Sequence, residues 1–199
     1  MSTPDLAIIY NENLPGDLFE EFKASISSGD LRVGIESRED DGPYACPEWF
    51  ILTAAAVFIG KSYFDGFLKE AGKDHYQALK SHLAGLTNKV MYKPRIEPVI
   101  LGTKGKMSRN NPYSLAFSIY AEANDGNSFK LLLPKPSDTE DYTEIIYQFL
   151  EFLNSYHLGV KFLEDIGFDN QITPPSRTIF VHMNNESKQI EWLDEREFR

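Results

Sequence analysis

The run of apolar residues from Trp49 to Ile59 constrains the fold more than any other feature of the sequence. Only Thr53 interrupts its eleven residues, and an amphipathic stretch continues it to Leu68. A helix that crosses a bilayer needs about 20 consecutive apolar residues, so this run is too short to span one. We therefore predict a helix over residues 49–68 whose first part is buried on all sides in the core.

The N-terminal region has the pattern of a strand, a helix and a second strand. Leu6–Tyr10 is a short apolar run between polar residues, which predicts a buried strand. Pro15 favours the start of a helix and Gly29 its end. Apolar and polar residues alternate over Leu31–Ile35, the period of a strand with one face in water. This order fits a parallel crossover, which would be right-handed.

The rest of the chain changes between helical and strand periods. Helical spacing predicts one helix over residues 76–90 and another that starts at the capping-box sequence Ser137–Glu140 and ends near Gly159. The turn sequence Asn124–Asn127 lies between two alternating segments and predicts a β-hairpin. The strands predicted in this part are 98–101, 115–121, 129–133, 178–183 and 189–193, and the last two form a closing hairpin.

This order of elements predicts one α+β domain over residues 1–199. Its sheet is expected to be largely antiparallel, with about four helices packed on it. The sequence contains no internal repeat and no linker rich in glycine or serine. A domain of this length buries about 70% of the surface of its unfolded chain, so we expect it to fold without a disulfide or a metal ion.

The composition restricts the class of partner and the compartment. The formal net charge is −10, which disfavours nucleic-acid binding because phosphate contacts need clustered lysine and arginine. Cys46 is the single cysteine, and the first residues lack the basic and apolar regions of a signal peptide. We therefore expect a cytoplasmic protein that binds no nucleic acid. The four histidines and one cysteine form no ligand set along the sequence, so no metal or cofactor is expected.

Asp74 and His75 are the catalytic candidates. They are adjacent residues in a predicted helical region, where such a pair more often marks a solvated first turn than a site. His75 and His82 are seven residues apart, which places them about 10 Å apart along a helix. That separation is too large for both to bind one zinc ion.

A basic segment stands out against the acidic chain. Between Lys89 and Arg109 there are six basic residues and one acidic residue, a balance of +5 (six minus one). We predict that Lys104, Lys106 and Arg109 lie on an exposed loop that binds an anion or an acidic partner. The spacing of glycines and lysines does not match a nucleotide-binding P-loop. The alternative is a solvated loop whose basic residues pair with the protein's own carboxylates.

These observations favour a non-catalytic protein-interaction protein of bacterial type, with an immunity or conflict-system role as one form of that hypothesis. It depends on the acidic charge, on the lack of a complete catalytic set, and on 14 Phe and 10 Tyr that can anchor an interface as well as a core. Two alternatives remain. One is an enzyme whose site assembles around Asp74, His75 and the loop 104–109. The other is a membrane-acting effector that uses the apolar helix 49–68. The sequence does not determine the oligomeric state.

Overall fold

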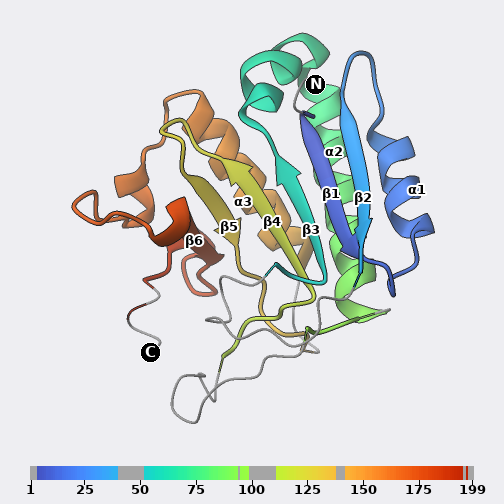
Figure 1. The fold of residues 1–199 in the computed structure, drawn as a ribbon. Coiled ribbons are helices and arrows are strands. Elements are labelled where there is room, and N and C mark those ends of the chain that lie inside the picture. The colour runs from blue at the N-terminus through green and yellow to red at the C-terminus, as the bar shows by residue number, and fades with distance from the viewer. Residues whose placement is uncertain are drawn as a thin grey trace.

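The strand–helix–strand unit predicted at the N-terminus is confirmed. The computed structural model describes residues 4–39, 52–93, 95–98, 111–137, 142–194 and 196. In it, β1 (Leu6–Asn11) leads through α1 (Asp17–Ile26) to β2 (Val33–Arg38). β1 and β2 pair in parallel and lie side by side in Figure 1.

The apolar run predicted as a helix contains a strand, and that prediction was wrong. Residues 49–51 lie outside the described part of the chain, and β3 (Ala55–Ile59) follows. Ala55 is 0% exposed, and so are the next two residues. A strand covered on both faces shows no alternation, so its apolar run is indistinguishable by period from a buried helix.

The amphipathic stretch after this strand is helical, as predicted. It comprises a π-helical segment, η2 (Tyr63–Phe67), and the long helix α2 (Leu68–Tyr92). Gly72 has φ of 78° and interrupts the helical backbone between the two helical segments predicted over 49–68 and 76–90. The apolar side chains at helical spacing over 76–90 are buried: Tyr76, Leu79, Leu83, Leu86 and Val90.

Both predicted hairpins are present. β4 (Phe117–Glu122) and β5 (Ser128–Leu131) pair antiparallel around Gly126, and β6 (Thr178–Met183) pairs antiparallel with β7 (Ile190–Trp192). Between the hairpins lie α3 (Tyr142–His157) and two short 3₁₀ helices, η3 (Leu163–Ile166) and η4 (Pro175–Arg177). The capping-box residues 138–140 and the strand candidate from residue 99 onward lie outside the described residues.

The sheet is mixed, which corrects the prediction of a largely antiparallel one. Its strand order is β2-β1-β3-β4-β5-β6-β7. The pairs β1–β2, β3–β4 and β5–β6 are parallel, and the pairs between them are antiparallel. Each parallel pair is joined by one helix. Because β3 was predicted as helix, the crossover from β3 through α2 to β4 was missed, and the fold is mixed α/β.

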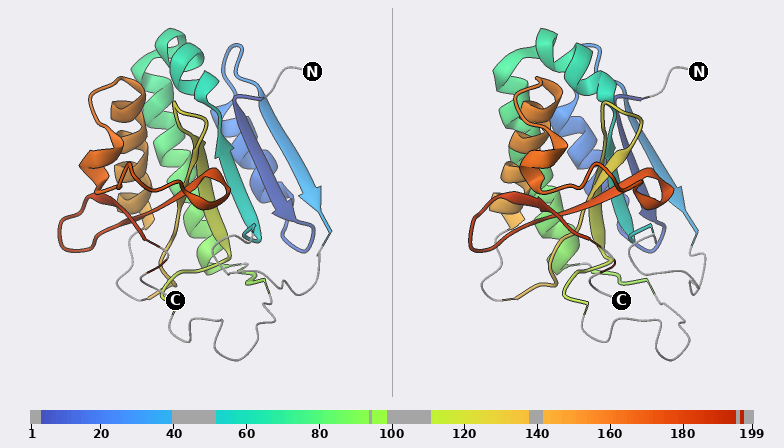
Figure 2. Two further views of the ribbon diagram at one scale, coloured as in Figure 1. Left: turned by 60° about the vertical axis from the view of Figure 1, so that its left-hand side comes forward. Right: turned by 90° about the vertical axis from the view of Figure 1, so that its left-hand side faces the viewer.

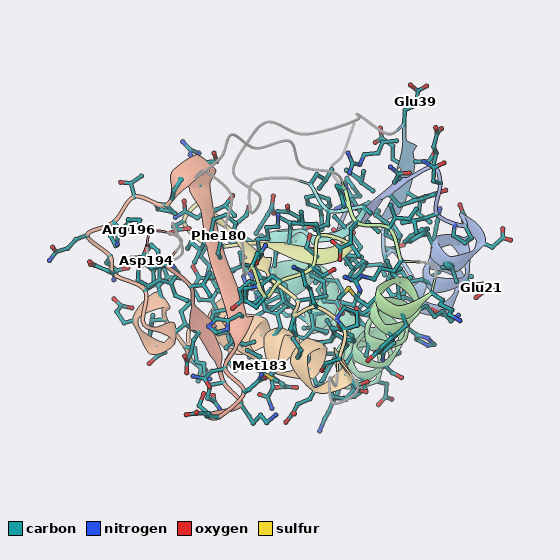
Figure 3. The ribbon with its side chains drawn as sticks, turned by 90° about the horizontal axis from the view of Figure 1, so that it is seen from below. Glu21, Glu39, Phe180, Met183, Asp194 and Arg196 are labelled. Atoms are coloured by element: carbon teal, nitrogen blue, oxygen red, sulfur yellow. The ribbon has the colours of Figure 1, made fainter. Side chains whose placement is uncertain are left out.

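The helices α1, α2 and α3 cover one face of the sheet, as the turned views show (Figure 2). Seen from below, α2 and α3 lie on one side of the strands (Figure 3). The side chains of β1, β3, β4 and β5 that face these helices form one apolar core with them. Examples are Ile8, Val57, Ile119 and Phe129 on the strands and Phe149 on α3.

The crossover through α3 has the opposite hand to the crossover through α1. β5 runs in the same direction as β1, but β6 lies on the other side of β5 from the side that β2 takes relative to β1. Because both helices lie on one face of the sheet, one of these two crossovers is right-handed and the other is left-handed. About 98% of such crossovers are right-handed, so one of the two has the rare hand. The third unit uses a long connection, residues 158–177, to bring α3 back to β6. That connection carries the candidate site.

Candidate functional site

Large apolar side chains that remain exposed are concentrated in one short segment. Among the described residues, the exposed large hydrophobic side chains are Tyr92 (48% exposed), Leu158 (61%), Val160 (71%) and Phe162 (58%). The last three alternate along five consecutive residues. We call residues 158–162 the apolar loop. Single exposed apolar residues are ordinary on a protein surface, whereas a contiguous group of them is a feature that interaction sites share.

The start of the apolar loop is fixed to the end of α3. Gly159 has φ of 71°, a left-handed conformation that favours glycine, and its N–H donates to the carbonyl of Tyr156 at 3.0 Å. The N–H groups of Val160 and Lys161 both donate to the carbonyl of Ser155, at 2.9 and 3.1 Å. These bonds satisfy carbonyls that the last turn of a helix leaves without partners.

The end of the apolar loop is fixed as well. The carboxylate of Asp165 accepts a hydrogen bond from the Phe162 N–H at 2.7 Å, and the Asp165 N–H donates to the Phe162 carbonyl at 3.2 Å. Phe168 follows η3, is buried, and packs edge-on against Trp192 of β7, with ring centroids 5.2 Å apart. Both ends are therefore anchored. A backbone held in one conformation loses little entropy when its exposed side chains are buried by a partner.

Carboxylates border the apolar loop. Glu164, Asp165 and Asp169 are exposed, whereas Lys161 within the loop is partly buried. Glu164 and Asn170 form a hydrogen bond, which holds one of these carboxylates beside the loop. The exposed apolar side chains are thus followed along the chain by three exposed carboxylates, which we call the rim of the loop.

Substitutions at two glycines test the backbone conformation at the start of the loop, because they should shift the melting temperature in opposite directions. Gly159→Ala is expected to lower the melting temperature, because a left-handed conformation costs a residue with a Cβ about 1 kcal/mol. Gly85→Ala is the matched control. Gly85 is exposed in α2 and has nothing within 4 Å of a built Cβ, so alanine there is expected to raise the melting temperature by a gain of about 1 kcal/mol in helix propensity. Equal shifts in thermal denaturation would contradict the left-handed cap.

Asp74 and His75 lie in α2 but do not converge on one site. His75 is 8% exposed, and its Nε2 lies 3.1 Å from the Ile26 carbonyl at the end of α1. Burial lowers the pKa of His75 below its ordinary value. Asp74 is exposed on the adjacent position of the helix. The described contacts of His75 therefore join α2 to α1.

The basic segment is only partly described. Lys104, Lys106 and Arg109 lie outside the described residues. Two other basic residues of the segment pair with the protein's own carboxylates: Lys89 with Glu21 at 3.2 Å, and Arg95 with Glu97 at 2.5 Å. The predicted role of the three loop residues as a binding site stays a prediction.

A buried polar cluster that no sequence pattern indicates lies on the sheet face opposite the helices. Lys130 of β5 is 1% exposed, with Nζ 5.2 Å from the centre of the Tyr120 ring. Burial raises the pKa of Tyr120 to about 12, so its hydroxyl stays protonated at neutral pH. The Thr53 and Ser118 hydroxyls are 2.7 Å apart, and Arg38 donates to the Thr53 carbonyl at 3.0 Å. These contacts connect β2, the start of β3, β4 and β5.

Within the described part of the chain, no group of three or more His, Cys, Asp or Glu side chains is placed to hold a metal ion. Among the same residues, no helix combines the length and hydropathy that crossing a membrane requires. No family model, no curated protein and no solved structure matches the chain.

Proposed function

We propose that this chain is a non-catalytic protein-interaction protein that docks a partner on the apolar loop. The observation that supports it most directly is the concentration of Leu158, Val160 and Phe162, each more than half exposed, on a backbone that is hydrogen-bonded at both ends. Aromatic and aliphatic anchors of this kind contribute most of the affinity of protein interfaces.

The rim of the loop indicates the chemistry of the partner. Its exposed carboxylates, within a chain of net charge −10, favour a protein whose apolar recess is bordered by lysine and arginine. An immunity or conflict-system role toward a basic protein is one form of this proposal. If Lys104, Lys106 and Arg109 bind an acidic group, that group forms a second contact of the chain, separate from the partner's contact with the apolar loop.

The other two hypotheses have less support. An enzyme around His75 would need a substrate-facing imidazole, whereas Nε2 lies against the Ile26 carbonyl. A membrane-acting helix over 49–68 would need helical residues where β3 lies at the centre of the sheet.

The proposal is tested with a loop variant and a matched control. The loop variant carries Leu158→Ser, Val160→Ser and Phe162→Ser. The control carries Tyr92→Ser, which removes the other large aromatic side chain that is exposed among the described residues. Changes at exposed positions usually alter stability by within about 0.5 kcal/mol each, so both proteins are expected to fold. The loss of buried anchors worth about 2 kcal/mol each should weaken binding at least about 30-fold.

The measurement is cross-linking capture from cell extract, followed by titration of the purified partner. We expect one partner to be retained by the wild type and by Tyr92→Ser, and to be lost by the loop variant. Its binding should weaken when salt rises from about 0.1 M to about 1 M, because charges at the rim are then screened. Retention of every partner by the loop variant would overturn the proposal. The proposal would also be overturned if the only loop-dependent binding found were flotation with anionic vesicles, or self-association in sedimentation.

A further inference from the structure

His157 is the last residue of α3 and directly precedes the apolar loop. Its ring stacks on the ring of Phe64 in η2, with centroids 4.3 Å apart and planes inclined by 9°. The ring of Tyr156 packs edge-on against it at 5.4 Å. This stack joins the C-terminal end of α3 to η2. The Ser155 and Tyr156 carbonyls that hold the loop lie one turn or less before it.

Both ring nitrogens of His157 are enclosed. Nδ1 and Nε2 are buried, and neither has a partner at full hydrogen-bond geometry; the backbone of Glu122 is the one hydrogen-bonding group near enough to favour the protonated ring. A neutral imidazole tolerates such a site better than an imidazolium, which would bury two donors and a charge. Burial accordingly lowers the pKa of His157 below its ordinary value of 6.5.

Four charged or titratable groups face His157. Asp65 from η2 and Glu122 at the end of β4 favour the protonated ring, and Lys61 opposes it. The hydroxyl of Tyr156 is occupied, since it accepts a hydrogen bond from the Asn124 N–H at 3.3 Å. The Glu122 carboxylate also accepts a hydrogen bond from the Lys61 N–H at 2.7 Å. Carboxylates thus act on the charge of the ring, but no hydrogen bond joins either carboxylate to it in the stacked position.

We propose that His157 is a proton-sensitive latch: its neutral ring, stacked on Phe64, holds the end of α3 and the apolar loop in the docking conformation, and protonation draws it toward Asp65 and Glu122 and releases the loop. As a regulatory device this rests on the proposed function. The conformational step itself requires no partner.

The sign of the pH dependence follows from the burial. A histidine whose pKa is lowered in the folded state binds fewer protons there than in the open state. The latch is therefore fully closed above the ordinary pKa of 6.5 and opens as the pH falls below it. His75 and His182 also have a lowered pKa because of burial, so acid weakens the whole fold as well. A local measurement is needed to separate the latch from this global effect.

Hydrogen–deuterium exchange of the full-length chain gives that measurement. Exchange is compared at about pH 7.5 and about pH 5.5, on either side of the ordinary histidine pKa, after correction for the intrinsic rate. In the wild type, the Val160 and Lys161 amides should lose protection at the lower pH, because the open state binds the proton that the closed state excludes. The amides of β3 should change less.

His157→Phe keeps the aromatic stack and cannot be protonated, so its loop should show no such pH dependence. His157→Gln is the second uncharged variant if the phenylalanine is not accommodated, with the same expectation. His82→Gln changes an exposed histidine of α2 and should behave as the wild type. A wild-type loop with no pH-dependent exchange would overturn the latch, as would an unchanged pH dependence in both His157 variants. Neither result affects the capture experiment, so the failures of the two proposals are distinguishable.

Discussion

Replacing Ala55 with aspartate is expected to prevent folding or to leave a protein that unfolds at very low denaturant concentration. Ala55 is 0% exposed in β3, where its register partners are Tyr10 on β1 and Phe117 on β4. A carboxylate there has neither water nor a cation. Burying an unpaired charge costs several kcal/mol, a large part of the 5–15 kcal/mol that stabilises an ordinary domain.

The measurement is urea denaturation followed by circular dichroism, with Ala24→Asp as the control. Ala24 is exposed near the end of α1, so the same substitution there adds the charge in water. It should cost less than about 1 kcal/mol, mainly through the helix dipole. A wild-type denaturation midpoint in Ala55→Asp would show that this position is not buried in the sheet.

The same residue shows where prediction from the sequence reaches its limit. The burial of Ala55 follows from the apolar run around it, but the secondary structure does not. A helix and a strand that are covered on all sides have the same featureless pattern. Where one face remains in water, as in α2 and α3 and in the 178–193 hairpin, the period is visible and the predictions are confirmed.

The order of the sheet could not be derived from local patterns. The turn sequence between β4 and β5 fixes an antiparallel pair, because a short connection permits no other. The pairing of β1 with β3 and of β5 with β6 joins segments that are far apart in the chain. Such pairing depends on the packing of the whole core.

The apolar loop was missed for a related reason. Gly159 predicted the end of a helix, and this end is confirmed. The alternation of Leu158, Val160 and Phe162 beyond it is a visible signal, but the same alternation occurs in buried strands. Exposure is a property of the tertiary fold, since it depends on whether another element covers the segment. Lys130 is the converse case: its residue type predicts solvent exposure, and the fold buries it.

Asp5 lies directly before β1 and is a buried carboxylate that forms an ion pair with the partly exposed Arg32. Its carboxylate accepts two hydrogen bonds from the Arg32 guanidinium, at 2.6 and 3.0 Å, one from the Arg32 N–H at 3.1 Å, and one from the Ser62 hydroxyl at 2.5 Å. The side chain of Asp5 is only 6% exposed. These contacts connect β1, the start of β2 and the residues before η2, next to the segment that holds Phe64.

Asp5→Ala is therefore expected to reduce the free energy of unfolding at neutral pH by about 2 kcal/mol. The hydrogen bonds from Arg32 hold the pKa of Asp5 at about 2, below its ordinary 3.8. A lowered pKa stabilises the folded state above pH 3.8, and this contribution is lost as the pH falls through about 2. Urea denaturation at several pH values should show a large difference between the variant and the wild type at neutral pH and a small one near pH 2.

Asp30→Ala removes an exposed carboxylate close by in the sequence and should change stability by less than about 0.5 kcal/mol. A difference between Asp5→Ala and the wild type that stays constant down to pH 2 would show that the lost packing, and not the ion pair, carries the effect.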